Sequence, residues 1–544
     1  MEVKTTKATQ LTFEQVESEL PSEKTEKISS NSHTTRPKSA FEKLGFKDSI
    51  KIIHKEIQGL YLADNSPWII GYSGGKDSTG TLQLIWYAVA ELPKEKRQKT
   101  IHVISTDTMV ENPIVAGWVK NSLESIGKEA NKQELPFTPK LIFPRIEESF
   151  WVNLIGRGYP APRNKFRWCT DRLKINPSNR FISEVVNNTG EAILCLGARV
   201  AESSARAKVI KKHSRFRFRD RLNPSSSLPG CMIYTPVEEF SNDDIWFYLN
   251  NTKNPWGINN KELMGMYAGA SKDGECPLVV DTNTQSCGNS RFGCWVCTMV
   301  EQDKSMAAMI QNDSEKEWML PLLELRNELD FRNNTNPEQK LDHHLRDFRR
   351  MGGAVQLIKE GQYVPGPYTQ QSRANWLRML LEAQVHVRRN GPPAVRELDL
   401  ISLDELKEIR RIWVVDKHEL EDILPKIYEQ ATGEVYPEKT LDDNLILKEK
   451  EMQKLEAICG EDRMHYELIR ELLSRTRQQR SSGKRANIIE QLEKSFQRHF
   501  FENKEDAIMR ATKRTEKRNS LKKRKEEQGM EMKEVNSLLS GDLL

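Results

Sequence analysis

Two glycines and two serines surround a lysine and an aspartate in one short polar segment. Glycine lets a backbone approach a ligand closely, and the amides at the start of a helix bind anions. An apolar run precedes the segment, and residues 82, 85 and 89 recur at helical spacing after it. We therefore predict a phosphate-binding loop between a strand and a helix, with an unliganded turn as the alternative. The loop residues are Ser73, Gly74, Gly75, Lys76, Asp77 and Ser78.

This loop does not fit the Walker A motif, which needs four residues between its glycines and then Lys-Ser or Lys-Thr. Only three residues separate Gly71 from Gly75, and Lys76 is followed by Asp77. The sequence therefore indicates another class of nucleotide-binding loop.

Carboxylates follow the second apolar run, at Asp107 and Glu111. Because ligands bind where the strands of an open α/β sheet end, this pair suits a metal ion or ribose hydroxyls. A helix cap by Asp107 or Thr108 is the alternative.

A further polar segment follows the fourth apolar run and contains Gly197, Arg199, Glu202 and Arg206. The two arginines are seven residues apart, about two turns if the stretch is helical, so both could face one anionic ligand. A surface helix with a Glu202–Arg206 pair is the alternative, but it leaves Gly197 unexplained.

Five basic residues surround Cys169 in RNKFRWCTDRLK. This environment predicts a lowered thiol pKa and a thiolate that carries a persulfide, attacks an activated phosphorus or binds metal.

Four more cysteines lie within 22 residues, a spacing that predicts one metal site. Both zinc and a cubane iron-sulfur cluster take four thiolates, so the spacing leaves the metal open. The predicted ligands are Cys276, Cys287, Cys294 and Cys297.

Short apolar runs alternate with amphipathic stretches from about residue 45 to 250, which predicts a doubly wound, mostly parallel α/β sheet. The runs are 68–72, 101–105, 140–143, 192–197 and 232–234. Glu, Lys, Arg and Leu dominate after residue 300 and predict a largely helical C-terminal region. The predicted parts are a flexible leader (1–40), a nucleotide domain (45–250), a Cys-rich segment (251–300), a helical region (301–505) and a basic tail (506–544).

Composition argues against secretion and membrane insertion. Eight cysteines among 544 residues are too sparse for a disulfide scaffold, and neither a signal peptide nor a membrane span is present in the sequence. We expect a cytoplasmic protein with no membrane partner. The net charge is only +5, but nine Lys and Arg between Arg510 and Lys525 accompany a single acid, Glu516. That run predicts a solvated helix or tail, or weak attraction to nucleic acid.

The SGGKDS loop resembles that of the N-type ATP-pyrophosphatases, an adenine nucleotide alpha-hydrolase-like fold, and GxRxxESxxR resembles their phosphoadenylyl-sulfate reductase branch. Together with STDTMVENP, KFRWCTDRLK, CGNSRFGCWVC and YVPGPYT, these motifs are similar to the DndC family, the sulfurtransferases of DNA phosphorothioation, over residues 50 to 400. The resemblance implies that the loop holds ATP pyrophosphate and Mg²⁺, and that Lys76, Asp77, Arg199 and Arg206 act in catalysis.

The same resemblance favours a [4Fe-4S] cluster over zinc, with Cys169 either carrying sulfur or replacing Cys276 or Cys287 as a ligand. It implies adenylation of a DNA backbone phosphate, sulfur from a cysteine desulfurase and a complex with other phosphorothioation proteins. Alternatives are an adenylyl-sulfate or phosphoadenylyl-sulfate reductase, a tRNA thiolase and a non-enzymatic iron-sulfur scaffold that binds nucleic acid. The Glu-Cys-Gly-x-His-x-Gly segment of phosphoadenylyl-sulfate reductases does not occur in the sequence, which argues against that activity.

Overall fold

The computed structural model describes residues 39–163, 166–202, 207–208, 219, 221–270, 292–333, 341–359, 362–437, 446–447, 449–481 and 488–528. Three predicted site residues, Arg206, Cys276 and Cys287, lie outside these ranges, as does nearly all of the predicted leader.

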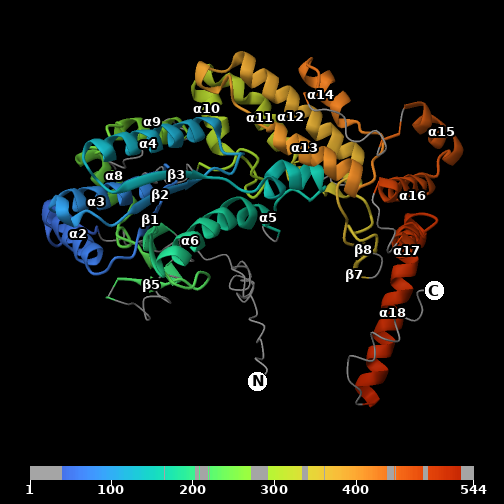
Figure 1. The fold of residues 1–544 in the computed structure, drawn as a ribbon, viewed down its shortest axis with the longest axis horizontal. Coiled ribbons are helices and arrows are strands. Elements are labelled where there is room, and N and C mark those ends of the chain that lie inside the picture. The colour runs from blue at the N-terminus through green and yellow to red at the C-terminus, as the bar shows by residue number, and fades with distance from the viewer. Residues whose placement is uncertain are drawn as a thin grey trace, which may run out of the picture. The chain divides into compact units, whose positions relative to one another are not determined.

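The described strands form a six-stranded sheet and a separate two-stranded hairpin (Figure 1). The large sheet has the order β3-β2-β1-β4-β6-β5, and every neighbouring pair is parallel except β5 with β6. The predicted doubly wound, mostly parallel sheet is therefore confirmed. The strands are β1 (Trp68–Gly71), β2 (Ile101–Thr106), β3 (Phe137–Ile142), β4 (Ala192–Cys195), β5 (Asn223–Pro224), β6 (Cys231–Tyr234), β7 (Leu357–Lys359) and β8 (Gln362–Tyr363).

Helices cover both faces of the large sheet (Figure 1). Trp68 and Ile70 of β1 point into the core shared with α2, α3, α4, α8 and α9, whereas Ile69 points to the opposite face, which α6 covers. This alternation is the period of two that a strand imposes. The helices are α2 (Gly45–Leu62), α3 (Lys76–Ala90), α4 (Pro113–Lys132), α5 (Trp168–Thr170), α6 (Asn176–Thr189), α8 (Asn242–Asn251) and α9 (Asn260–Gly269).

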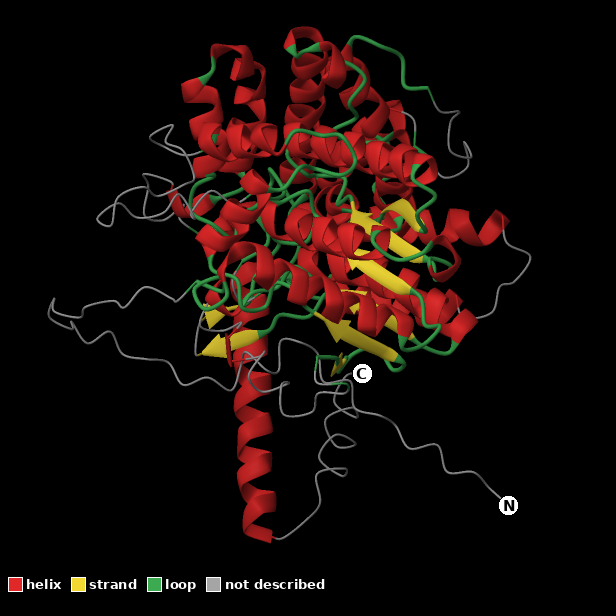
Figure 2. Ribbon diagram, turned by 90° about the vertical axis from the view of Figure 1, so that its left-hand side faces the viewer, coloured by secondary structure: helices red, strands yellow, loops and turns green. Residues whose placement is uncertain are grey.

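The predicted helical C-terminal region is also confirmed (Figure 2). Its core combines α10 to α14 with segments that follow β3, including Trp151, Trp168 and Trp295. These helices therefore pack on the chain next to the predicted site. They are α10 (Lys304–Asn312), α11 (Leu320–Glu328), α12 (Gln370–Asn390), α13 (Leu403–Arg411), α14 (Leu424–Thr432), α15 (Glu449–Cys459), α16 (Arg463–Ser481), α17 (Ile488–Arg498) and α18 (Lys504–Gln528).

Shorter helical segments connect these elements. Single π-helical turns span Val152–Gly156, Asp171–Ile175 and Ile412–Asp416. The 3₁₀ segments are Lys94–Lys96, Ile146–Glu148, Val200–Glu202, Ser314–Met319, Phe331–Asn333, Asp342–Leu345 and Pro393–Val395. Within the described part of the chain, every helix is too short or too polar to span a bilayer.

Local sequence explains several element ends. Ser241 and Asp244 form a capping box at the start of α8. The third strand differs from its prediction, because β3 begins at Phe137, three residues before the predicted run. The Phe137 ring stacks on Trp86 of α3 with ring centroids 4.5 Å apart, a long-range contact that local pattern does not reveal.

Candidate nucleotide and thiol site

The phosphate loop lies where the strand order reverses. The chain runs outward from β1 through β2 to β3, then returns to β4 on the other side of β1. Open α/β sheets bind ligands at such a switch point, beyond the carboxyl ends of the strands. The two loops that leave β1 and β4 contain residues 73–78 and Gly197, so two of the predicted segments meet there.

Hydrogen bonds within the loop fix its curvature. Gly74 has a φ of 72°, in the left-handed region that favours glycine. The Ser78 hydroxyl donates to the carbonyl of Gly75 (3.0 Å) and accepts from the N–H of Ser73 (3.2 Å). The hydroxyls of Ser73 and Ser78 lie 3.1 Å apart. The turn therefore leads directly into the N-terminus of α3, where helix amides favour an anion.

Gly197 and Arg199 hold the loop from the β4 side. A Cβ atom at Gly197 would lie 2.7 Å from the carbonyl carbon of Asp77, so only glycine fits against this turn. Arg199 is 3% exposed and donates from Nε to the Asp77 carboxylate (2.7 Å) and from Nη1 to the carbonyl of Phe240 (3.3 Å). The structure thus brings Asp77 of the phosphate loop together with Gly197 and Arg199 of the segment that follows β4.

Lys76 lies in the same cluster, with its ammonium group 3.4 Å from Asp77 and 5.5 Å from the centroid of the Tyr267 ring. Burial, together with the nearby Arg199 charge, lowers the pKa of Lys76. Glu202 is near enough to oppose this shift, which places it beside the loop as predicted. Burial raises the pKa of Tyr267 to about 12, so its hydroxyl stays protonated next to the loop.

Asp107 and Glu111 both follow β2, but their carboxylates make different contacts. Asp107 accepts from the N–H of Met109 (2.8 Å), which has a φ of 63°, and burial raises the Asp107 pKa with help from Glu111. Neither Asp107 nor Thr108 caps a helix, because the N-cap of α4 is Asn112. Asp107 and Glu111 line a cavity of about 150 Å³ with Trp295.

Glu111 connects this strand end to the predicted metal ligands. It forms an antiparallel bridge with Cys294, and the N–H of Trp295 donates to the carbonyl of Val110 (3.0 Å). The Cys294 thiol lies 3.3 Å from the Thr108 hydroxyl and 3.7 Å from the Glu111 carboxylate. Cys297 belongs to the same turn, since its N–H donates to the carbonyl of Cys294 (3.1 Å).

Cys169 lies near this cysteine turn, but its predicted acidity is wrong. Burial, and then the neighbouring Cys297 sulfur, raise the pKa of the Cys169 thiol. Two of the basic residues around it in sequence bind elsewhere: Arg163 pairs with Asp342 (2.8 Å), and Arg172 bonds to Asn153 and Tyr159. Although these two arginines are near Cys169 in the sequence, their charges are held by other groups.

Lys174 is the basic residue that does face the thiols. Its ammonium group lies 3.4 Å from Glu111, and Cys294 followed by Glu111 raises its pKa. Its side chain is 50% exposed, so solvent still reaches it. Lys174 was part of the quoted motif, but spacing alone gave it no separate role.

Two arginines hold the backbone that follows Cys297. Arg326 of α11 is fully buried and donates to the carbonyls of Cys297 (3.1 Å), Glu301 (3.0 Å) and Val300. Arg332 donates to the carbonyls of Thr298 (2.8 Å) and Val300 (2.9 Å). Both arginines pair with Asp330, at 3.0 and 2.7 Å. This arginine clamp, Arg326 and Arg332 with Asp330, fixes the cysteine turn.

A complete metal site is not formed by the described residues, among which no three Cys, His, Asp or Glu side chains converge closely enough to hold an ion. The thiol chemistry of Cys294, Cys297 and Cys169 nevertheless fits a thiolate-bound metal. Cys276 and Cys287 lie outside the described residues, so the predicted set of four stays a prediction.

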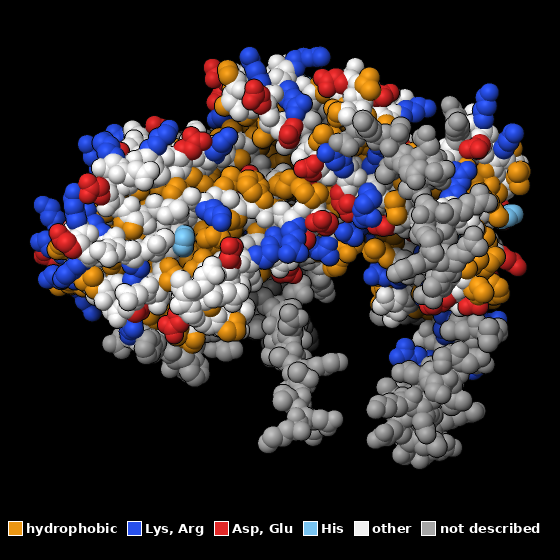
Figure 3. Space-filling model, in the orientation of Figure 1, with side chains coloured by type: hydrophobic (Ala, Val, Ile, Leu, Met, Phe, Trp, Pro, Cys, Tyr) orange, Lys and Arg blue, Asp and Glu red, His pale blue; other side chains and the backbone are white. Residues whose placement is uncertain are grey.

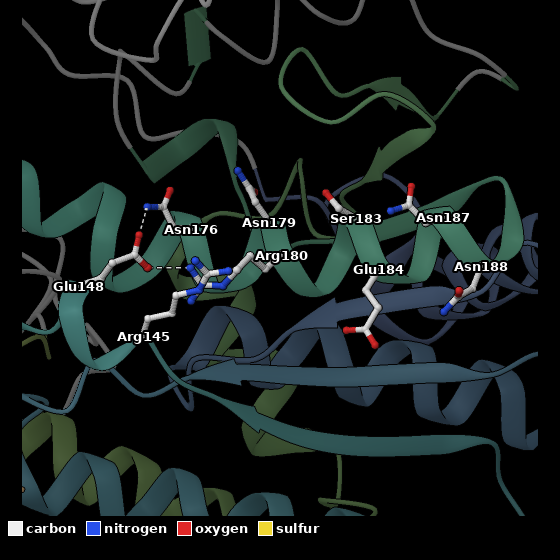
Figure 4. Close-up of a pocket in the computed structure, with 9 residues that line it drawn as sticks. All are labelled: Arg145, Glu148, Asn176, Asn179, Arg180, Ser183, Glu184, Asn187 and Asn188. Atoms are coloured by element: carbon white, nitrogen blue, oxygen red, sulfur yellow. Dashed lines mark hydrogen bonds and ion pairs between the residues drawn. The ribbon is translucent and has the colours of Figure 1, made fainter. Parts of the chain in front are cut away.

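A larger groove, with a volume of about 590 Å³, lies elsewhere, along α6 (Figure 4). Asn176 and Arg180 of α6 both bond to Glu148, at 3.1 and 2.7 Å. The remaining lining is mainly Asn and Ser side chains on the outer face of the helix. None of its lining residues is a predicted site residue, so size alone does not identify the reaction centre.

Comparison with known proteins narrows the chemistry of this arrangement. Residues 67–299 match the phosphoadenosine phosphosulfate reductase domain. The matched segment includes the phosphate loop, Gly197, Arg199 and the cysteine turn. The match supports a role in sulfur transfer or nucleotide-dependent chemistry.

Two individual proteins are also similar to parts of the chain. An uncharacterized protein of Methanocaldococcus jannaschii, MJ0066, is 28% identical over 200 residues, which are 37% of this chain and 35% of that protein. The chain thus spans about a third of that relative. The U34-tRNA thiolase NcsA from Methanococcus maripaludis, solved with its [4Fe-4S] cluster, is 12% identical with a TM-score of 0.25, covering 52% of this chain and 80% of the thiolase. A TM-score this low supports no inference about this chain.

Four residues that shape the site were not predicted from the sequence. Tyr267 and Trp118 contact the phosphate loop, the latter by donating from Nε1 to the carbonyl of Gly74 (3.0 Å). Arg326 and Arg332 hold the cysteine turn. All four are distant in sequence from what they contact, and an exposed helical Arg and a buried one look alike in a sequence.

Proposed function

We propose that this protein is an ATP-dependent sulfurtransferase that adenylates a DNA backbone phosphate and replaces one of its non-bridging oxygens with sulfur. The observation that carries the proposal is the phosphate loop at the switch point, fixed from the β4 side by Gly197 and Arg199. The match to the phosphoadenosine phosphosulfate reductase domain supports the sulfur half. The choice of DNA rests on the resemblance to the DndC family.

The loop suits cleavage of ATP between its α and β phosphates. A non-bridging oxygen of the substrate phosphate attacks the α phosphorus, an O–P bond forms, and the bond to pyrophosphate breaks. The amides of the loop and the first turn of α3 would bind the leaving pyrophosphate. Lys76 and Arg199 would stabilise the charge that develops. Asp77 and Ser78 would hold Mg²⁺, with Asp77 shared between the ion and Arg199.

Sulfur replaces AMP in the second half-reaction. A cysteine desulfurase supplies persulfide sulfur, which a thiol reductant brings to the sulfide level in a two-electron step that leaves a disulfide. The sulfide attacks the phosphorus of the adenylated DNA, an S–P bond forms, and AMP leaves as the P–O bond breaks. Cys169, Cys294 and Cys297 would hold an iron-sulfur cluster or receive sulfur, with Lys174 and Glu111 beside them. A bound cluster would supply a site for sulfur or electrons. Zinc in its place would give a structural site only.

Product analysis tests the ATP half directly. We expect purified protein with Mg²⁺ and ATP, with water replacing the DNA phosphate as the nucleophile, to yield AMP and pyrophosphate. Asp77→Ala should lower the rate about 100-fold or more, because metal binding and the partner of Arg199 are both lost. Asp77→Asn separates the two causes, since it keeps the shape of the turn. ADP and inorganic phosphate as products would refute the assignment.

Substrate identity needs a separate measurement. We expect mass spectrometry of host DNA to lose phosphorothioate dinucleotides when the gene is deleted, with tRNA thionucleosides unchanged. The reverse pattern would make the chain a tRNA thiolase. Sulfite formation from adenylyl sulfate by the purified protein would make it a reductase.

A further inference from the structure

The C-terminal helix α18 divides into an anchored start and a solvated remainder. Asn503 caps it by accepting from the N–H of Asp506 (2.9 Å), and Ala507 is fully buried. The Lys504 ammonium group lies 5.1 Å from the centroid of the Tyr363 ring in the β7–β8 hairpin. Arg510 pairs with Asp506 (2.9 Å) and stacks over Phe500. The first two turns are therefore held by specific contacts.

After Thr512 the helix continues with an exposed stretch. All eight residues from 513 to 520 are exposed, and they include four cations and one acid. The cations are Lys513, Arg514, Lys517 and Arg518. Elsewhere, Lys and Arg side chains are interspersed with acidic ones on the face drawn in Figure 3. The exposed residues 513–520 of α18 are thus predominantly cationic, with a net charge of +3 from four cations and one acid.

This helix has a cost that a bound polyanion would relieve. Lys513 and Lys517, and likewise Arg514 and Arg518, are four residues apart, so like charges face each other along the helix and destabilise it. The residues 513–520 are all exposed, so packing contributes little to offset this repulsion. Phosphates placed between the cations would turn the repulsion into attraction and release counterions.

We propose that the segment 513–520 of α18 is a docking helix for duplex DNA that lies in the major groove and contacts phosphates on both of its walls. The inference rests on the proposed function for its choice of nucleic acid and adds the surface that binds it. The major groove of B-form DNA admits an α-helix, whereas the major groove of A-form RNA is too narrow and deep for side chains to read. At about 1.5 Å per residue, the segment extends about 12 Å.

Salt dependence of DNA binding tests the proposal. The measurement is fluorescence anisotropy of a labelled 30-base-pair DNA duplex with the full chain, between about 50 and 250 mM KCl. The variant replaces Lys513, Arg514, Lys517 and Arg518 with Gln, a good helix former, and circular dichroism verifies its helix content. A control replaces four lysines on other helices and loops, Lys51, Lys94, Lys132 and Lys407, and so removes the same charge.

If α18 binds the duplex, its variant weakens binding at least tenfold at 100 mM KCl. The slope of log K against log salt concentration becomes shallower by about 3, since each lost phosphate contact removes about 0.9. The control variant changes the slope by less than one. Equal slopes for the two variants would overturn the proposal, and so would an equal loss of affinity for an RNA duplex of the same sequence.

This test is separate from that of the proposed function. ATP cleavage measured without DNA depends on the phosphate loop and is expected to be the same in the α18 variant as in the native chain. A native chain that releases ADP fails as a pyrophosphatase whatever the salt slope. If the α18 variant binds DNA as tightly as the native chain, the docking-helix proposal is refuted, and the ATP-pyrophosphatase assignment is unaffected.

Discussion

The phosphate loop and the cysteine turn adjoin ends of neighbouring strands, but different kinds of contact hold them. The loop is fixed largely by its own residues, through Ser73 and Ser78, with Gly197 and Arg199 added from β4. The cysteine turn is fixed by residues far away in sequence, Glu111 on one side and the arginine clamp on the other. A locally built site can be recognised from a motif, whereas a site built from distant parts shows only its ligands.

Burial favours the neutral form of a titratable group in both regions, although the groups differ. It lowers the pKa of Lys76 in the loop and raises the pKa of Cys169 near the turn, so it favours the neutral form of each. A bound anion would favour the charged form of the amine, and a bound cation would favour the charged form of the thiols. The two halves of the proposed reaction would each supply one.

The largest effect is expected at the contact between the two strand ends. Gly197→Ala puts a methyl group 2.7 Å from the Asp77 carbonyl carbon, so the loop must shift. We expect ATP turnover to fall about 100-fold, because displacing a catalytic group by about 1 Å costs that much, with a loss of about 1–3 kcal/mol in stability from overpacking. Steady-state pyrophosphate release and thermal unfolding measure the two.

Gly117→Ala is the matched control. Gly117 lies within α4, and a Cβ atom there meets nothing within 4 Å. We expect unchanged turnover and a gain of about 1 kcal/mol from helix propensity. Equal turnover in the two variants would show that Gly197 does not set the loop.

Because local contacts build the phosphate loop and distant ones build the cysteine turn, the sequence predicted the loop better than the turn. The sheet, the loop and the capping box at Ser241 follow from local patterns, and the structure has them. The pKa of Cys169 could not be predicted, because the partners of Arg163 and Arg172 are set by tertiary contacts. Arg326 is part of a helical run rich in charge, and only the fold shows that it is buried.

The arginine clamp gives the next prediction. Arg326→Lys keeps the charge but loses the planar fork that reaches three carbonyl groups, so the turn carrying Cys297 loosens. Residues that support metal ligands typically contribute 10- to 100-fold in affinity, and we expect metal binding to weaken by that range. Iron and zinc per chain after dialysis against a chelator measure it.

Arg378→Lys serves as its control, since Arg378 is half-exposed on α12 and pairs with Glu382 (2.7 Å). Metal retention in this variant should match the native chain. Full retention in Arg326→Lys as well would show that the cysteine turn does not need the clamp.

Whether Cys169 is a metal ligand determines how far the thiol site extends beyond the cysteine turn. If Cys169 is a ligand, Cys169→Ser lowers iron per chain by more than half in protein purified without oxygen, whereas Cys459→Ser in α15 leaves it unchanged. If Cys169 only carries sulfur, iron is retained and sulfur transfer alone is lost. Iron analysis together with a single-turnover sulfur-transfer assay separates these results.

The smallest expected effect is the pH dependence of the phosphate loop. Burial lowers the pKa of Lys76, so its amine loses its proton at a lower pH than an ordinary lysine does. We therefore expect kcat/KM for ATP to decline severalfold as pH rises toward 10. For stability the sign is opposite: a lysine depressed in the folded state favours folding at high pH and opposes it as pH falls. Lys76→Arg stays charged, so its kcat/KM should remain level over the same range. At saturating ATP the bound phosphates hold the proton on Lys76, so the decline in kcat moves to higher pH. An identical alkaline decline in Lys76→Arg would assign the titration to another group and remove Lys76 from the comparison of the two sites.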